Sequence, residues 1–155
     1  MEERLYEKIL IATDGSKNVQ NAVDLGIEIA KATGAKVYAA MVVPSHSLTS
    51  YMKSHMEEWE APYDTIRQVA NKAIEYAMDK AKMEGVEATG VILEGHPPEQ
   101  ITAYAQGNDM DLIVMGTLGR TGIDRFLIGS VAENVIRHSK VKVLVVPSNA
   151  GSNDK

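Results

Sequence analysis

The sequence predicts an α/β fold: a doubly wound sheet of five parallel strands with helices on both faces. Its short apolar runs lack polar alternation, which is typical of strands that are buried on both faces. Between these runs lie stretches in which apolar residues recur at helical spacing. Because strands and helices alternate along the chain, we expect parallel βαβ units joined by right-handed crossovers.

The length of the chain agrees with one domain of ordinary size. Its 155 residues are enough to bury a sizeable core, and neither an internal repeat nor a linker divides them. We therefore expect a single domain over residues 1–147. The tail, residues 148–155, has nothing to pack and is expected to be disordered.

The first half of the chain is predicted to contain two strands and two helices. Residues 6–13 form a short apolar run that ends at the turn signal Asp-Gly-Ser, which indicates a buried strand. Helical spacing follows over residues 16–34, where Ser16 is expected to cap the helix and a glycine to end it. Residues 35–43 form the second strand. A long helix is expected over residues 62–84, with one apolar face made of Ile66, Val69, Ala73, Ala77 and Ala81.

The second half is predicted to contain three strands and two helices. The strands are expected at residues 86–95, 111–116 and 141–147, each of which is rich in apolar residues. A short helix is expected at residues 97–107, because its two leading prolines suit the first turn of a helix. The last helix is expected at residues 129–139, directly after a glycine-rich segment.

Composition excludes several classes of function. With 45% hydrophobic and 24% charged residues, the chain has the composition of a globular protein in water. A net charge of −5 argues against a dedicated nucleic-acid binder. The absence of cysteine excludes disulfides, thiolate catalysis and zinc sites built on cysteine. The start of the chain does not have the pattern of a signal peptide, and no run of about 18 apolar residues would form a membrane span. We therefore expect a cytoplasmic protein that does not bind membranes or nucleic acid.

The segment MGTLGRTGIDRFLIGS, at residues 115–130, carries the clearest chemical signal. In doubly wound sheets, ligands bind beyond the carboxyl ends of the strands, where the strand order reverses. Gly116 and Gly119 let backbone amides approach a ligand closely. Gly129 and Ser130 open a helix, whose free N–H groups and dipole favour an anion. These features predict a phosphate cradle built from backbone. Two basic residues between its halves are expected to add charge-assisted contacts, namely Arg120 and Arg125.

Other interpretations of this segment stay open at the level of the sequence. It can be a flexible connection between a strand and a helix. Ser130 and Glu133 match a capping box, which needs no ligand, so the Ser130 hydroxyl has two possible partners. Two familiar nucleotide signatures are absent: no Gly-x4-Gly-Lys-Ser/Thr loop occurs, and Gly-x-Gly-x-x-Gly does not follow the first strand.

The histidines and the irregular segment at residues 44–60 do not predict a site. No two histidines have the spacing of a metal template such as His-Glu-x-x-His; the four are His46, His55, His96 and His138. An apolar stripe at helical spacing is interpreted as packing, a lid or a subunit contact; it comprises Met52, Met56, Trp59 and Tyr63. The acidic residues around Trp59 are expected to form a solvated face.

The glycine pattern resembles that of the universal stress protein (UspA-like) family, in its ATP-binding subgroup. These members carry Gly-x2-Gly-x9-Gly-Ser/Thr, and the four positions are Gly116, Gly119, Gly129 and Ser130. The resemblance extends over nearly the whole chain, from KILIATDGS near the start to VKVLVVP near the end. Further shared stretches are GHPPEQI, DLIVMGTLGRTG and GSVAENVIRHSKVKVLVV.

The resemblance implies a fold and a set of binding residues. The implied fold is Rossmann-like and similar to the adenine nucleotide alpha hydrolases, with strand order 3-2-1-4-5. An adenine nucleotide, ATP or else ADP or AMP, is implied at the switch between strands one and four, with Mg²⁺ accompanying it. The nucleoside side is implied to involve Ala12, Thr13 and Asp14, with the backbone of Val42 reading the adenine edge. Ribose and phosphates are implied to contact Met115, Gly116, Gly119, Arg120, Gly129, Ser130 and Val131. Some ATP-binding members have proline in place of Ala12, which still offers a backbone carbonyl.

Asp14 has several possible roles. A carboxylate beside phosphates is repelled unless a cation lies between them or it faces a hydroxyl. It therefore binds either a ribose hydroxyl or Mg²⁺ on the phosphates, or it only shapes the Asp-Gly-Ser turn.

Three functional hypotheses follow. The first is a regulatory stress-response protein in which nucleotide occupancy is a state, because no general base and no lysine is placed for phosphoryl transfer. The second is a slow ATPase or self-phosphorylating protein, with Asp14 positioning Mg²⁺ and Ser130 or Thr121 near the γ-phosphate. The third is a dimerising scaffold without nucleotide. The resemblance also implies a homodimer through the last strand, residues 141–147, whose apolar edge invites pairing.

Overall fold

The computed structural model describes residues 3–45, 63–117 and 128–148. Strands and helices alternate along these residues, as the sequence predicts. In chain order they are β1 (Lys8–Ala12), α1 (Lys17–Thr33), β2 (Lys36–Val43), α3 (Tyr63–Met83), β3 (Ala88–Glu94), α4 (Pro97–Gly107), β4 (Leu112–Gly116), α5 (Ser130–His138) and β5 (Lys142–Val146).

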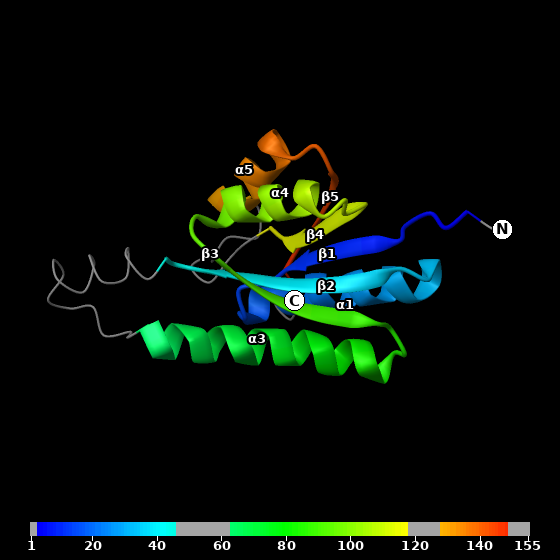
Figure 1. The fold of residues 1–155 in the computed structure, drawn as a ribbon, viewed down its shortest axis with the longest axis horizontal. Helices are drawn as coiled ribbons and strands as arrows, with labels where there is room; N and C mark the ends of the chain where they lie inside the picture. The colour runs from blue at the N-terminus through cyan, green and yellow to red at the C-terminus, as the bar shows by residue number, and fades with distance from the viewer. Residues whose placement is uncertain (1–2, 46–62, 118–127, 149–155) are drawn as a thin grey trace, which may run out of the picture.

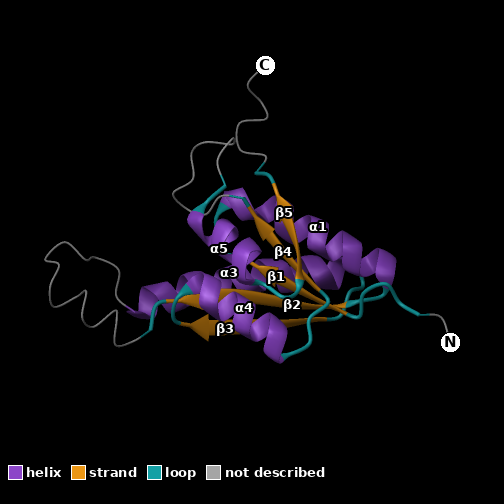
Figure 2. Cartoon of the chain, turned by 90° about the horizontal axis from the view of Figure 1, so that it is seen from above, coloured by secondary structure: helices purple, strands orange, loops and turns teal. Residues whose placement is uncertain are grey.

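The five strands form one parallel sheet in the order β3-β2-β1-β4-β5. This confirms the predicted fold class and the order that the resemblance implies. From β1 the chain builds outward through β2 to β3, then returns to the other side of β1 for β4 and β5 (Figures 1 and 2). The order therefore reverses between β1 and β4, so the carboxyl ends of these two strands mark the place where ligands bind in folds of this type.

Of the helices in the described residues, two cover each face of the sheet. Helices α1 and α3 pack on one face, against the side chains of Ile9 and Ile11 from β1. Helices α4 and α5 pack on the other face, against Leu10 and Ala12 from the same strand. Figure 1 shows α4 and α5 above the sheet and α3 below it. The side chains of β1 therefore alternate between two apolar layers, which explains why this strand is continuously apolar in sequence.

Burial on both faces holds for the centre of the sheet and not for its edges. Every residue of β4 is buried, and so are the last four residues of β1. At the edges, β3 has no buried residue and β5 has only Val146. The expectation of a sheet covered on both faces is therefore correct for the strands that position the site. The edge strands have a neighbour on one side only.

The predicted elements are all present, and their ends differ by at most a few residues. The helix at residues 97–107 has the predicted bounds, with proline in its first turn. On α3, the predicted face contacts the core through Ala73, Ala77 and Ala81, which are buried. Among the described helices, none is long and apolar enough to cross a membrane. The irregular segment from residue 46, with its Met52–Trp59 stripe, and the tail from residue 149 lie outside the described residues.

The turn before α1 corrects one prediction. Ser16 occupies the N-cap position, but its side chain makes no capping hydrogen bond. At the other end, Gly34 has φ 75° and its N–H donates to the Ala30 carbonyl, so this glycine ends the helix as predicted.

Helix α1 packs closely on the sheet at Gly26. A Cβ atom at this position would lie 2.6 Å from Cδ1 and 2.8 Å from Cγ1 of Ile11, which is fully buried. We predict that Gly26→Ala lowers the free energy of unfolding by about 1–3 kcal/mol, because overpacking outweighs the better helix propensity of alanine. Urea unfolding measures this difference.

Gly107→Ala is the matched control, because a Cβ atom there meets nothing within 4 Å. Its stability is expected to stay equal or to rise by less than about 1 kcal/mol. Equal stability of Gly26→Ala and the unchanged protein would contradict the close packing of α1 on Ile11.

Candidate functional site

A cavity of about 300 Å³ lies beyond the carboxyl ends of β1 and β4, where the strand order reverses. Its walls come from the ends of β1, β2 and β4 and from the starts of α4 and α5, with one residue of α1. It is lined by Ala12, Thr13, Asp14, Val19, Ala40, Val42, Pro97, Ile101, Met115, Gly116, Gly129, Ser130, Val131 and Ala132. The cavity therefore occupies the place that the topology predicts for a ligand.

The two halves of the glycine segment meet at this cavity. The Thr117 N–H donates to the Val146 carbonyl at 3.1 Å, which extends the pairing of β4 with β5 by one residue. The Gly129 N–H donates to the Thr117 carbonyl at 2.6 Å. Because of this second bond, the end of β4 and the start of α5 lie side by side although eleven residues separate Thr117 from Gly129 in sequence. The middle of the segment, with Gly119, Arg120, Thr121 and Arg125, lies outside the described residues.

The start of α5 differs from the predicted capping box. Gly129 is the N-cap residue, with φ −65° and ψ 160°, and Ser130 is the first residue of the helix. No side chain caps this end, and Glu133 instead forms an ion pair with Arg137 at 2.9 Å. The capping-box interpretation is therefore wrong, because the serine stands one position too late in the helix. The Glu133 N–H bonds the Gly129 carbonyl, but the three N–H groups before it have no acceptor within the helix.

Asp14 takes part in the turn that follows β1. Its Oδ1 accepts a hydrogen bond from the Ser16 N–H at 2.9 Å, and Thr13 Oγ1 accepts one from the Gly15 N–H at 3.1 Å. Gly15 has φ 77°, which favours glycine. The turn interpretation of Asp14 is therefore correct for one carboxylate oxygen. Asp14 also lines the cavity. A contact between its second carboxylate oxygen and a ligand stays a prediction.

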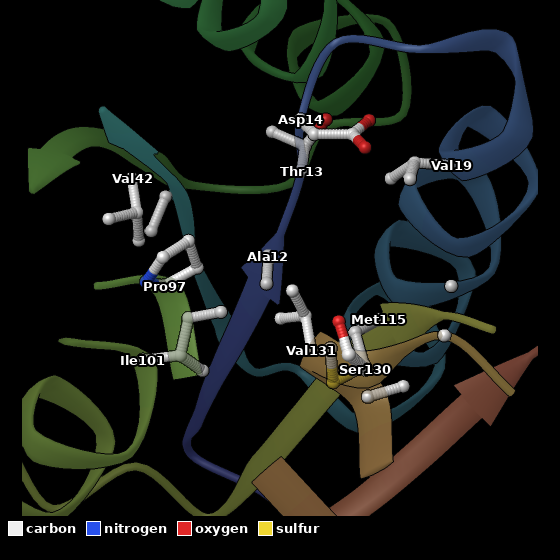
Figure 3. Close-up of a pocket in the computed structure, with 14 residues that line it drawn as sticks. Ala12, Thr13, Asp14, Val19, Val42, Pro97, Ile101, Met115, Ser130 and Val131 are labelled. Atoms are coloured by element: carbon white, nitrogen blue, oxygen red, sulfur yellow. The ribbon is translucent and has the colours of Figure 1, made fainter. Parts of the chain in front are cut away.

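The side of the cavity that faces the start of α5 is apolar. Figure 3 shows Val42, Pro97 and Ile101 gathered on one side, Ser130 and Val131 on the other, and Ala12 between them. Among the described lining residues, Asp14 is the only one with a charged side chain. A ligand in this cavity would therefore meet an apolar wall at one end and unpaired backbone N–H groups at the other.

Some lining residues were not predicted from the sequence. The stretch GHPPEQI is part of the resemblance to the family, but only the structure places Pro97 and Ile101 in the wall of the cavity. Gly95 of this stretch has φ 132°, and its N–H donates to the Val43 carbonyl at 2.9 Å. This turn directs α4 over the cavity, and a positive-φ glycine followed by proline is the local signal for it. The remaining unpredicted residues are Val19, Ala40 and Ala132.

Nine of the eleven predicted binding residues line the cavity; Gly119 and Arg120 lie outside the described residues. Within the described part of the chain, no group of three or more histidine, aspartate or glutamate side chains is placed to hold a metal ion.

The Asp14 turn yields a testable prediction. Asp14→Ala removes the acceptor for the Ser16 N–H, so we expect the free energy of unfolding to fall by about 1 kcal/mol. Asp14→Asn keeps an oxygen at the same place and is expected to retain nearly all of the stability. Urea unfolding of both variants measures the difference. An equal loss in both would mean that the carboxylate charge, and not this hydrogen bond, stabilises the turn.

Comparison with known proteins agrees with this geometry. The model of the universal stress protein family matches residues 5–147. The universal stress protein MJ0531 of Methanocaldococcus jannaschii is 39% identical over 145 residues, which cover 93% of this chain and 84% of that protein. A universal stress protein solved in complex with cAMP is 28% identical, with a TM-score of 0.68 over 92% of this chain and 98% of that one. The hypothetical protein MJ0577 is also 28% identical, with a TM-score of 0.75 over 92% of this chain and 96% of that one. The chain belongs to the universal stress protein family.

Proposed function

We propose that this protein binds an adenine nucleotide, ATP in the first place, and that nucleotide occupancy serves as a regulatory state. The observation that carries the proposal is the two-sided cavity beyond the carboxyl ends of β1 and β4. It has an apolar wall at one end and the start of helix α5 at the other. The related protein solved with cAMP supports the class of ligand.

In this proposal the base occupies the apolar end of the cavity. Val42, Pro97 and Ile101 offer aliphatic surface to a planar ring, and burial of such a ring favours binding. The ribose lies toward Met115 and Gly116. Because Gly116 has no side chain, there is room beside the end of β4.

The phosphates lie at the start of α5. Unpaired N–H groups and the helix dipole favour an anion there, at residues 130–132, which line the cavity. Gly129 has backbone angles that any residue adopts, so its use is the space that a missing side chain leaves for the phosphates. Gly119 and Arg120 complete the cradle in this proposal.

Mg²⁺ fits as a companion of the phosphates and not as a resident metal. This ion keeps most of its ligands as water and phosphate oxygens and takes one or two carboxylates from a protein. Among the described lining residues, Asp14 has the one acidic side chain, and one of its oxygens already accepts a hydrogen bond from the Ser16 N–H. Asp14 would therefore supply a single oxygen to Mg²⁺, or else accept a hydrogen bond from a ribose hydroxyl.

The proposal predicts saturable binding of ATP that depends on Gly129. In Gly129→Val the new side chain would fill the place of the phosphates, so we expect the affinity to fall tenfold or more, which is at least about 1.4 kcal/mol. Isothermal titration calorimetry measures both affinities. Gly107→Val is the control, because its Cβ meets nothing within 4 Å and the residue does not line the cavity. No saturable binding by the unchanged protein, or equal affinity in Gly129→Val, would overturn the proposal.

A regulatory role also predicts that bound ATP stays intact. In a single-turnover experiment with purified protein in excess over ATP, we expect no phosphate release within minutes, because no lysine or general base is placed for phosphoryl transfer among the described lining residues. Phosphate that appears on this timescale, and disappears in Asp14→Ala, would identify a slow ATPase instead.

We further propose a homodimer through the edge strand β5. Among the described strands, β5 pairs only with β4, so its outer backbone groups are available to a second copy. Residues 141–147, which comprise β5 and one residue on each side of it, are mainly apolar. We predict that the unchanged protein elutes as a dimer in size-exclusion chromatography with light scattering, and that Val143→Lys shifts it to the monomer mass. An unchanged mass in Val143→Lys would argue against this interface.

A further inference from the structure

A second cavity, of about 260 Å³, lies between α1 and α3 on the other face of the sheet. It is lined by Thr13, Gly15, Ser16, Gln20, Val23, Val69, Lys72, Ala73 and Tyr76. Thr13 lines both cavities, so the turn after β1 separates them. Since one water molecule takes up about 30 Å³ in the liquid, this space has room for a small molecule.

The Ser16 hydroxyl is buried in this region without a partner. Its Oγ is shielded from solvent and has no hydrogen bond to any described residue. A serine at an N-cap normally accepts a bond from a backbone N–H of the first turn, but this bond is absent here. A buried polar group without a partner is unfavourable. Ser16 is part of the lining of the second cavity, so a molecule there would supply the missing partner after the side chain rotates toward it.

The charge and the donors of the cavity indicate the class of molecule. Lys72 is the only charged side chain among its lining residues, and it forms no ion pair within the described part of the chain. Gln20 adds an amide donor. The Tyr76 hydroxyl donates to Asp24 at 3.1 Å, so it is not counted among the donors that a ligand would meet. A cation, a free hydroxyl and an amide together suit oxygen atoms that carry negative charge.

We propose that this second cavity binds a small oxyanion, a carboxylate or a phosphate, through Lys72 and Ser16. Lys72 offers its ammonium group from α3, and Ser16 offers its hydroxyl from the start of α1. The proposal does not depend on nucleotide binding, because it uses a different face of the sheet and different side chains.

Two-dimensional ¹H–¹⁵N NMR of the full chain tests the proposal. The protein is titrated with inorganic phosphate and, separately, with malonate, while sodium chloride keeps the ionic strength constant. We expect saturable shifts of the Gly15, Ser16, Gln20, Lys72 and Tyr76 amides in at least one titration, and the responding probe distinguishes phosphate from carboxylate. No saturable shift at these residues with either probe would overturn the proposal. So would shifts confined to residues 129–132, because the anion would then occupy the first cavity.

The charge contribution is tested with a matched pair of variants on α3. Lys72→Gln is expected to weaken binding of the responding probe about three- to tenfold, since it removes one charge-assisted contact at a partly exposed position. Lys82→Gln removes the same charge from the same helix, outside the lining of the cavity, and is expected to leave the affinity unchanged. Equal weakening in both variants would show a general effect of charge and would overturn the site.

The role of the hydroxyl is tested with Ser16→Ala. We expect weaker binding of the same probe, together with an equal or higher melting temperature of the ligand-free protein, because the variant loses no capping bond and no longer buries an unpaired oxygen. A lower melting temperature with unchanged probe affinity would show that the hydroxyl stabilises the helix and would overturn its role as a ligand contact. If Ser16→Ala does not fold, the pair of lysine variants decides the proposal alone.

Discussion

The hydrogen bond from the Gly129 N–H to the Thr117 carbonyl determines where helix α5 begins relative to strand β4. The candidate site depends on this relation. Without it, the segment between strand and helix would leave Gly116 and Gly129 at independent positions. With it, the first turn of α5 lies at the end of β4, and its unpaired N–H groups border the same cavity as Gly116. One hydrogen bond between backbone atoms therefore brings two parts of the glycine pattern, far apart in sequence, to the same cavity.

The other wall of the site depends on the alignment of β1 with β4. The Asp111 carboxylate accepts hydrogen bonds from the Glu7 and Lys8 N–H groups, at 2.8 and 2.9 Å, just before both strands begin. Parallel pairing then continues through Ile9 opposite Leu112 and Ile11 opposite Val114. Leu112, the first residue of β4, is opposite Ile9, the second residue of β1, and each strand has five residues, so their carboxyl ends lie within one residue of each other. The ligand position at the switch point is therefore fixed from the far end of the sheet.

The sequence predicts those features that depend on local signals, and it misses those that depend on distant contacts. The helix at Pro97–Gly107 has its predicted bounds because proline marks its first turn. In contrast, Ser130 and Glu133 satisfy a local capping pattern but do not form a capping box. Gly129, which bonds the distant Thr117 carbonyl, is the N-cap residue instead. Ser16 reaches the expected N-cap position without making the expected bond.

The lining of the cavity shows the same division. Gly116, Gly129 and Ser130 are found through the spacing of the glycine pattern. Pro97 and Ile101 enter the wall only because α4 crosses the face of the sheet after β3. Their distance along the chain from Gly129 gives no indication of this contact. The positive φ of Gly95 is the conformation that allows the chain to turn there.

Few of the described lining residues have a charged side chain, and this determines which interactions a ligand would make. Among the described lining residues, only Asp14 carries a charge, and the turn after β1 already uses one of its oxygens. Within the described lining, an anion would therefore meet backbone N–H groups and the helix dipole, together with any cation that it brings. Backbone donors do not titrate and are positioned before a ligand arrives, which suits a site that holds a nucleotide better than one that cleaves it. Cleavage would require a group that moves a proton or stabilises a leaving phosphate, and no such group borders the cavity in the described residues. The proposed regulatory role rests on this set of donors among the described lining residues.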